Sequence, residues 1–184
     1  DGLPTLAYYD QRLKFLDGSN LRNDIKIFQF SPIAEKEFGT GLVKIVRVVL
    51  EDSQGRALSY VVGGENVTLE IVCKTAIDIF SPIVGFILKD RLGQDIFVEN
   101  TFIAYLDNPP HFSSGERFTA KFSFVMPVLA KGDYAIAAAV ATGTQENHVQ
   151  HHWVNDALVF KVSQTHALGL VGLQGVDIRM ERIQ

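Results

Sequence analysis

The densest group of side chains able to bind a ligand lies between Asn147 and Asp156. If this segment is a strand, His148, Gln150 and His152 point to one face, because side chains alternate along a strand. Imidazole and amide groups donate and accept hydrogen bonds, which is the chemistry that sugar hydroxyls require. His148 and His152 would lie about 13 Å apart at ~3.3 Å per residue, too far to share one metal ion. The segment therefore predicts polar ligand binding without a metal.

Trp153 would lie on the opposite face of the same strand, together with His151. Two interpretations stay open for it. The indole can pack in the core beside Leu158 and Phe160, or it can serve as an aromatic platform for a sugar ring.

An alanine-rich strand precedes this segment, from Tyr134 to Ala141. One of its faces carries only methyl groups, and the residues on that face are Ala135, Ala137, Ala139 and Ala141. Such a face leaves a shallow trough, which the segment from His148 to Asp156 would border with polar and aromatic groups. The alternative is that the alanines pack under a loop or helix.

Four further residues are candidates for ligand contacts. Lys89 or Arg91 could pair with an anionic group on a terminal sugar. Asn100 and Tyr105 are additional hydrogen-bonding candidates.

Catalytic motifs do not emerge from the sequence. It contains no phosphate-binding G-x-x-x-x-G-K-[ST] or G-x-G-x-x-G motif and no G-x-S-x-G nucleophile elbow. The carboxylate pairs Asp90 with Asp95 and Glu51 with Asp52 are explained by turns, and Cys73 falls on a predicted core face. A glycan-processing jelly-roll enzyme would need a carboxylate pair beside the trough, which we do not find. We therefore expect no enzyme activity and no cofactor.

The overall charge and hydropathy pattern gives no indication of nucleic acid or membrane binding. The 184-residue chain has a net charge of −4 at pH 7, so no nucleic acid or anionic membrane is indicated as a partner. A membrane-spanning helix needs ~20 apolar residues, and the longest apolar run of this chain, from Tyr134 to Ala141, is less than half that length. We therefore expect no membrane insertion. The single cysteine excludes an intrachain disulfide framework.

From Leu42 onward the hydrophobic pattern has period two and is interrupted by glycine-containing turns. The segment from Val67 to Thr75 places Val67, Leu69, Ile71 and Cys73 on one face, and the segment from Glu116 to Met126 does the same with Phe118, Phe122 and Phe124. Further strands are predicted at 42–50, 83–90, 95–102, 134–142, 148–154 and 158–162. About eight such strands predict an all-β fold, an antiparallel β-sandwich of immunoglobulin-like or jelly-roll type.

The expected organisation has three parts. Residues 1–41 are a linker or lead-in, with a possible short helix at 6–16 and a possible first strand at 25–30, and residues 42–184 are the sandwich domain. Residues 174–184 form a terminal strand that docks on its own sandwich or is exchanged in a dimer. Because the chain starts Asp1-Gly2-Leu3, without methionine or a signal peptide, we expect it to be a piece of a longer protein.

Read in order, these strands carry a family resemblance. Its carriers include Val43-Lys44-Ile45-Val46, Gly64-Glu65-Asn66-Val67-Thr68-Leu69, Val84-Gly85-Phe86-Ile87-Leu88-Lys89-Asp90, Leu129-Ala130-Lys131-Gly132-Asp133-Tyr134 and His152-Trp153-Val154-Asn155-Asp156-Ala157-Leu158. Between about Phe38 and Leu173 the chain resembles the C-terminal domain of the ATP-binding subunit of O-antigen polysaccharide ABC exporters, the Wzt type. The ATPase part of that subunit is absent from this sequence.

The resemblance implies a cytoplasmic carbohydrate-binding module, peripheral to the inner membrane, in a transporter that works as a dimer. Such a module would bind the non-reducing, often modified end of a lipid-linked polysaccharide in lipopolysaccharide biosynthesis and select the finished chain for export. The other open hypothesis is a protein-interaction or dimerisation module without a glycan ligand.

Overall fold

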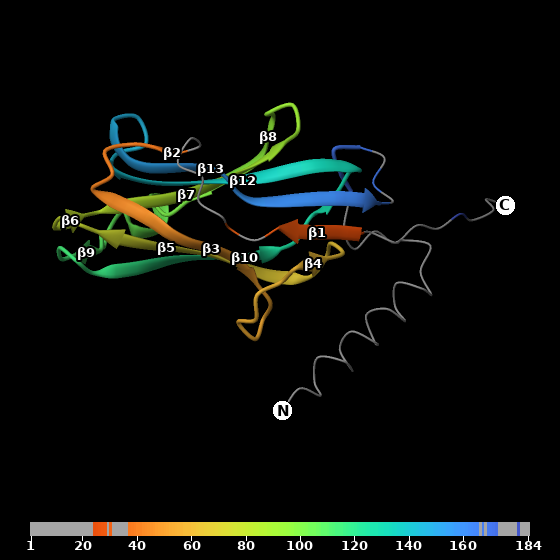
Figure 1. Cartoon of the computed structure of the whole chain (residues 1–184), viewed down its shortest axis with the longest axis horizontal. Coiled ribbons are helices and arrows are strands. Elements are labelled where there is room, and N and C mark those ends of the chain that lie inside the picture. The colour runs from red at the N-terminus through yellow and green to blue at the C-terminus, as the bar shows by residue number, and fades with distance from the viewer. Residues whose placement is uncertain are drawn as a thin grey trace.

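The computed structural model describes residues 24–28, 30, 37–165, 167, 169–172 and 180. These residues form an antiparallel β-sandwich, as the sequence predicts, with the larger sheet stacked on a three-stranded sheet (Figure 1). The larger, seven-stranded sheet has the order β4-β1-β13-β12-β7-β8, with β2 pairing with β13. Its strands are β1 (Asp24–Phe28), β2 (Glu37–Phe38), β4 (Tyr60–Val61), β7 (Pro82–Asp90), β8 (Asp95–Asn100), β12 (Gly132–Gly143) and β13 (His148–Gln164).

The second sheet has the order β10-β5-β3. Its strands are β3 (Val43–Glu51), β5 (Asn66–Thr75) and β10 (Arg117–Val125). Two short ladders and a 3-10 turn complete the described chain: β6 (Ile79–Phe80) with β9 (His111–Phe112), β11 (Val128–Leu129) with β14 (Val171–Gly172), and η2 (Ile103–Tyr105).

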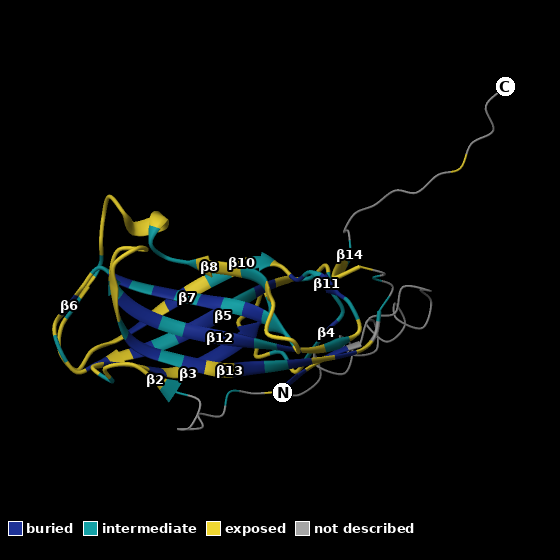
Figure 2. Cartoon of the chain, turned by 90° about the horizontal axis from the view of Figure 1, so that it is seen from above, coloured by how far each residue is buried: buried dark blue, intermediate teal, exposed yellow. Residues whose placement is uncertain are grey.

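The core lies between the two sheets and follows the period-two pattern of the sequence. On β5 the inward residues Val67, Leu69, Ile71 and Cys73 are all buried. Phe86 of β7 crosses to the three-stranded sheet, where its ring centroid lies 4.9 Å from that of Phe122. Figure 2 shows this burial running along the middle of the strands, with exposed residues concentrated in the loops. Hydrophobic burial between the sheets is the main stabilising contribution to such a fold.

The strands predicted at 148–154 and 158–162 are one continuous strand, β13. The interruption between them is a bulge at Asp156, whose φ of 52° is a left-handed conformation that aspartate tolerates. Beside β13 lie β12, β1 and β2, so this strand organises the large sheet.

The predictions for the two chain ends fall largely on residues that the structure does not describe. The possible helix at 6–16 and the terminal strand at 174–184, apart from Met180, lie outside the described residues. The division into a lead-in and a sandwich domain stays a prediction, although β1 and β2 of the lead-in pair with β13.

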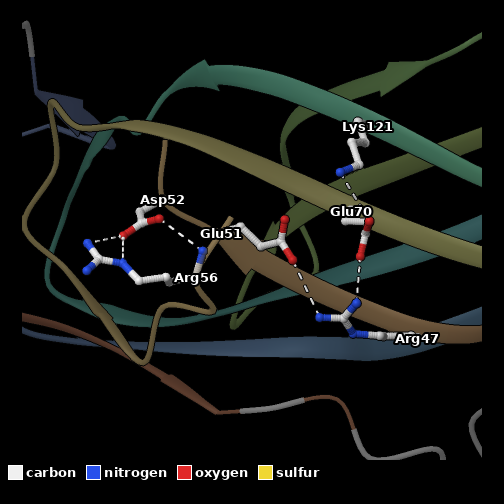
Figure 3. A network of polar contacts seen from close by, with 6 residues as sticks. All are labelled: Arg47, Glu51, Asp52, Arg56, Glu70 and Lys121. Carbon is white, nitrogen blue, oxygen red and sulfur yellow. Dashed lines mark hydrogen bonds and ion pairs between the residues drawn. The ribbon is translucent and has the colours of Figure 1, made fainter. Parts of the chain in front are cut away.

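The outward face of the three-stranded sheet carries a network of charged side chains (Figure 3). Glu70 lies between Arg47, at 2.8 Å, and Lys121, at 3.3 Å, and Arg47 also reaches Glu51 at 3.4 Å. Asp52 pairs with Arg56 at 2.7 Å in the following turn. Glu51 and Asp52 therefore have separate structural partners.

Candidate functional site

The outer face of the large sheet contains an open groove of about 340 Å³ that runs over β8, β7, β12 and β13. Its floor is the outward face of β12, where Ala137, Ala139 and Ala141 line the groove. The other lining residues are Ile83, Gly85, Phe86, Ile87, Val98, Glu99, Asn100, Thr144, Gln145, His148, Gln150 and Trp153.

Strand register places these residues in rows across the groove. In the central row Ala139 is paired with Gly85 on one side and with Trp153 on the other, and Gly85 is paired with Asn100. The two smallest residues therefore lie between an amide and an indole. The neighbouring rows are Val98–Ile87–Ala137 and Ile83–Ala141–Gln150. Methyl groups make up the floor of the groove, and polar side chains line its end near the β12–β13 turn.

A second bulge in β13 determines which of its side chains reach the groove. Val140 pairs with His152 and Ala141 pairs with Gln150, so His151 is an extra residue in β13. A bulge of this kind shifts the alternation of side chains by one position. As a result Gln150 and Trp153 lie on the groove face and His152 does not.

The predicted distribution of side chains on this strand was therefore wrong in two places. His152 was expected to share a face with His148 and Gln150, and it is buried instead. Trp153 was expected on the opposite face, and it lines the groove. Both errors have one cause, because a strict period of two cannot account for an extra residue.

The buried His152 joins the two sheets. Its Nδ1 accepts a hydrogen bond from the backbone N–H of Ile45 on β3 at 3.0 Å, and its Nε2 lies 3.3 Å from Glu37 Oε2. The imidazole is therefore a structural tie.

His151 is also buried and is held by two hydroxyl groups. Its Nδ1 lies 2.9 Å from Thr40 Oγ1, and its Nε2 lies 2.9 Å from Thr142 Oγ1. Burial lowers the pKa of the His151 imidazole, because removing the ring from water disfavours its charged form.

The polar side chains that line the groove already form some hydrogen bonds within the protein. Gln150 donates its side-chain amide to the carbonyl oxygens of Val140, at 2.9 Å, and His152, at 2.8 Å, which leaves Oε1 as an acceptor for a ligand. Asn100 Oδ1 accepts the N–H of Phe102 at 2.9 Å, so its amide hydrogens remain as donors. The groove thus offers an acceptor on one wall and a donor on the other.

The indole of Trp153, which lines the groove, has two contacts of its own within the protein. Its Nε1–H donates to Asn155 Oδ1 at 2.9 Å, and the Phe38 ring stacks against it with centroids 5.6 Å apart. His148 is exposed at the polar end of the groove.

Besides His152, four other predicted contact residues are not among those that line the groove. Lys89 forms an ion pair with Asp95 at 3.5 Å, and Arg91 lies in the exposed β7–β8 turn. Tyr105 is half exposed in η2, and Ala135 lies on β12 beyond the groove.

Sequence reasoning named Asn100 of the wall formed by β7 and β8, but it missed the apolar residues of that wall, Ile83, Ile87 and Val98. A signal for part of it was present. Outward Ile83 and Ile87 alternate with inward Val84, Phe86 and Leu88, so β7 is apolar on both faces, which is unusual for a strand with one solvated face.

A metal site, a membrane span and a reactive cysteine each have requirements that can be compared with the residues that the structure describes. No group of three or more His, Cys, Asp or Glu residues there could hold a metal ion, and no helix there is long and apolar enough to cross a membrane. Burial raises the pKa of the Cys73 thiol to about 12, which is opposite to the shift of a reactive cysteine.

The described residues thus form an antiparallel β-sandwich domain with an open groove of small, aromatic and amide side chains on the outer face of its larger sheet. The chain belongs to the family of Wzt C-terminal domains, whose family model matches residues 34–173. Comparison with curated proteins gives no significant match.

Among solved structures, the chain is similar to the crystal structure of the C-terminal domain of wzt, with a TM-score of 0.70. The match covers 83% of this chain and 93% of that one at 17% sequence identity. At this identity the likeness shows a shared fold.

Proposed function

We propose that this domain binds, without catalysis, the non-reducing and modified terminus of a lipid-linked O-antigen polysaccharide, and so gives an ABC exporter its substrate selection. The observation that supports this is the central row of the groove, where an indole and an amide flank a floor of alanine and glycine. An aromatic ring face packs on the C–H face of a sugar, and amides bind its hydroxyls.

Individual groups have distinct roles in this proposal. The ring of Trp153 carries the apolar face of the terminal sugar, while Gln150 Oε1 accepts from one hydroxyl and the Asn100 amide donates to another. His148 adds a hydrogen bond at the polar end. The preference for a chain end comes from the family resemblance.

The same resemblance supplies the setting. The domain would act on the cytoplasmic side of the inner membrane, as a homodimer, attached to an ATPase domain that contacts the membrane subunit of the exporter. Neither a nucleic acid nor membrane insertion of this domain is part of the proposal.

The decisive variant fills the groove from its floor. Ala139→Leu places a branched side chain between Trp153 and Gly85, and it points away from the core. Ala135→Leu is the matched control, because Ala135 lies on the same strand but does not line the groove. Calorimetry with delipidated O-antigen polysaccharide should show binding by wild type and Ala135→Leu and none by Ala139→Leu.

Two results would count against the proposal. Equal binding of polysaccharides with and without the terminal modification would exclude end recognition. If Ala139→Leu instead changes the oligomer mass in light scattering while wild type binds no glycan, the face is a protein interface.

A further inference from the structure

The segment Glu37–Gly41, which we call the strap, lies along β13 over the residues that form the groove wall. Phe38 pairs with Trp153 and Glu37 with Val154 in the strand register. Beyond β2, the N–H of Thr40 donates to the carbonyl oxygen of Gln150 at 3.2 Å, and the N–H of Gly41 donates to that of His151 at 2.9 Å. The strap therefore follows β13 continuously across its bulge.

Side-chain hydrogen bonds hold the strap to β13 at the bulge. Thr40 Oγ1 bonds His151 Nδ1, and the same imidazole bonds Thr142 of β12 through Nε2. One ring thus links the strap, β13 and β12. Glu37 lies 3.3 Å from the next imidazole, that of His152.

Gly39 allows the strap to lie this close. Its φ is +130°, and a Cβ atom placed there would overlap the carbonyl group of His151. Any side chain at this position would push the strap away from the bulge, so the close approach depends on glycine.

Phe38 connects the strap to the groove. This residue is 56% exposed, and its ring stacks on Trp153 at an interplanar angle of 19°. A stacked pair is energetically favourable, so Phe38 stabilises the orientation of the indole in which Trp153 lines the groove.

We infer that the strap is a positioning element of the groove: it holds the bulge of β13 and seats the indole of Trp153, so that ligand affinity depends on residues outside the groove. The glycan part of this inference rests on the proposed function. The seating of Trp153 does not, and it can be measured without a ligand.

Trp153 is the only tryptophan in the chain, so its fluorescence reports on this position alone. Gly39→Ala in the full 184-residue chain should raise acrylamide quenching and lower the anisotropy of Trp153. Gly64→Ala is the matched control, because Gly64 also has a positive φ, of +86°, but a Cβ there meets nothing within 4 Å. The control should keep the wild-type fluorescence.

Three milder variants keep the inference testable if Gly39→Ala does not fold. Phe38→Ala removes an exposed ring and should raise the acrylamide quenching of Trp153. It should also weaken polysaccharide binding by about two- to tenfold, which is the change in affinity expected from the loss of one aromatic pair. Thr40→Val should change the Trp153 signal in the same direction as Gly39→Ala, and Thr40→Ser, which keeps the hydroxyl, should restore it.

The outcomes separate the two proposals. Wild-type Trp153 signals in folded Phe38→Ala and Thr40→Val would overturn the positioning role, whatever the glycan result. Altered signals together with no polysaccharide binding by wild type would retain the positioning role and reject the proposed function.

Discussion

Removing the imidazole of His152 should destabilise the domain strongly, although the sequence suggests a ligand-binding residue. In His152→Ala the buried N–H of Ile45 loses its acceptor, which costs about 1–3 kcal/mol. The space left by the ring adds a further contribution, so we expect a total loss of about 2–4 kcal/mol. For a domain of this size that lowers the melting temperature by roughly 5–15 °C.

The assay is urea unfolding followed by Trp153 fluorescence and far-UV circular dichroism. His148→Ala is the control, because His148 is exposed and its loss should change the unfolding free energy by less than about 0.5 kcal/mol. His152→Asn should recover part of the stability, since Oδ1 can replace Nδ1 as the acceptor for Ile45. A midpoint for His152→Ala equal to that of wild type would refute the assignment of this histidine as a tie between the sheets.

Three other predictions follow from buried or paired groups. The Cys73 thiol, with its pKa raised by burial, should react with a thiol reagent such as DTNB only after unfolding; fast reaction of the native protein would contradict its core position. His151 has a folded pKa below its ordinary 6.5, so its contribution to stability is complete above pH 6.5 and is lost as the pH falls through the folded pKa; urea midpoints should therefore depend less on pH in His151→Asn. Glu70→Gln should cost about 1 kcal/mol or less at low salt, because both its cationic partners are more than half exposed, and a cost unchanged by high salt would argue against ion pairing.

The fold could be predicted because the alternation of apolar and polar residues is visible within each long strand. The inward set on β5, Val67, Leu69, Ile71 and Cys73, needs no knowledge of the rest of the chain to be recognised as a core face. The alanine face of β12 was visible in the same way, and three of its four alanines line the groove.

The composition of the groove walls could be predicted only in part. The orientation of His152 and Trp153 depends on an extra residue in β13, and that bulge is fastened by Thr40 and Gly39, more than a hundred positions earlier in the sequence. Local alternation has no access to such a contact. The apolar part of the wall from β7 and β8 was missed because residues of two separate strands had to be placed beside β12 by the sheet order.

The central position of β13 also has a consequence for the order of folding. Ile27 of β1 pairs with Phe160 of β13, so two segments near opposite ends of the chain must meet before the large sheet is complete. Pairings of such high contact order form slowly, because closing a long loop costs entropy before its contacts are gained. During synthesis β1 emerges early and has no partner strand on that side until the last part of the domain has left the ribosome. The β12–β13 hairpin, which carries the groove floor and Trp153, can form locally, so this part of the groove should be assembled before β1 pairs with β13.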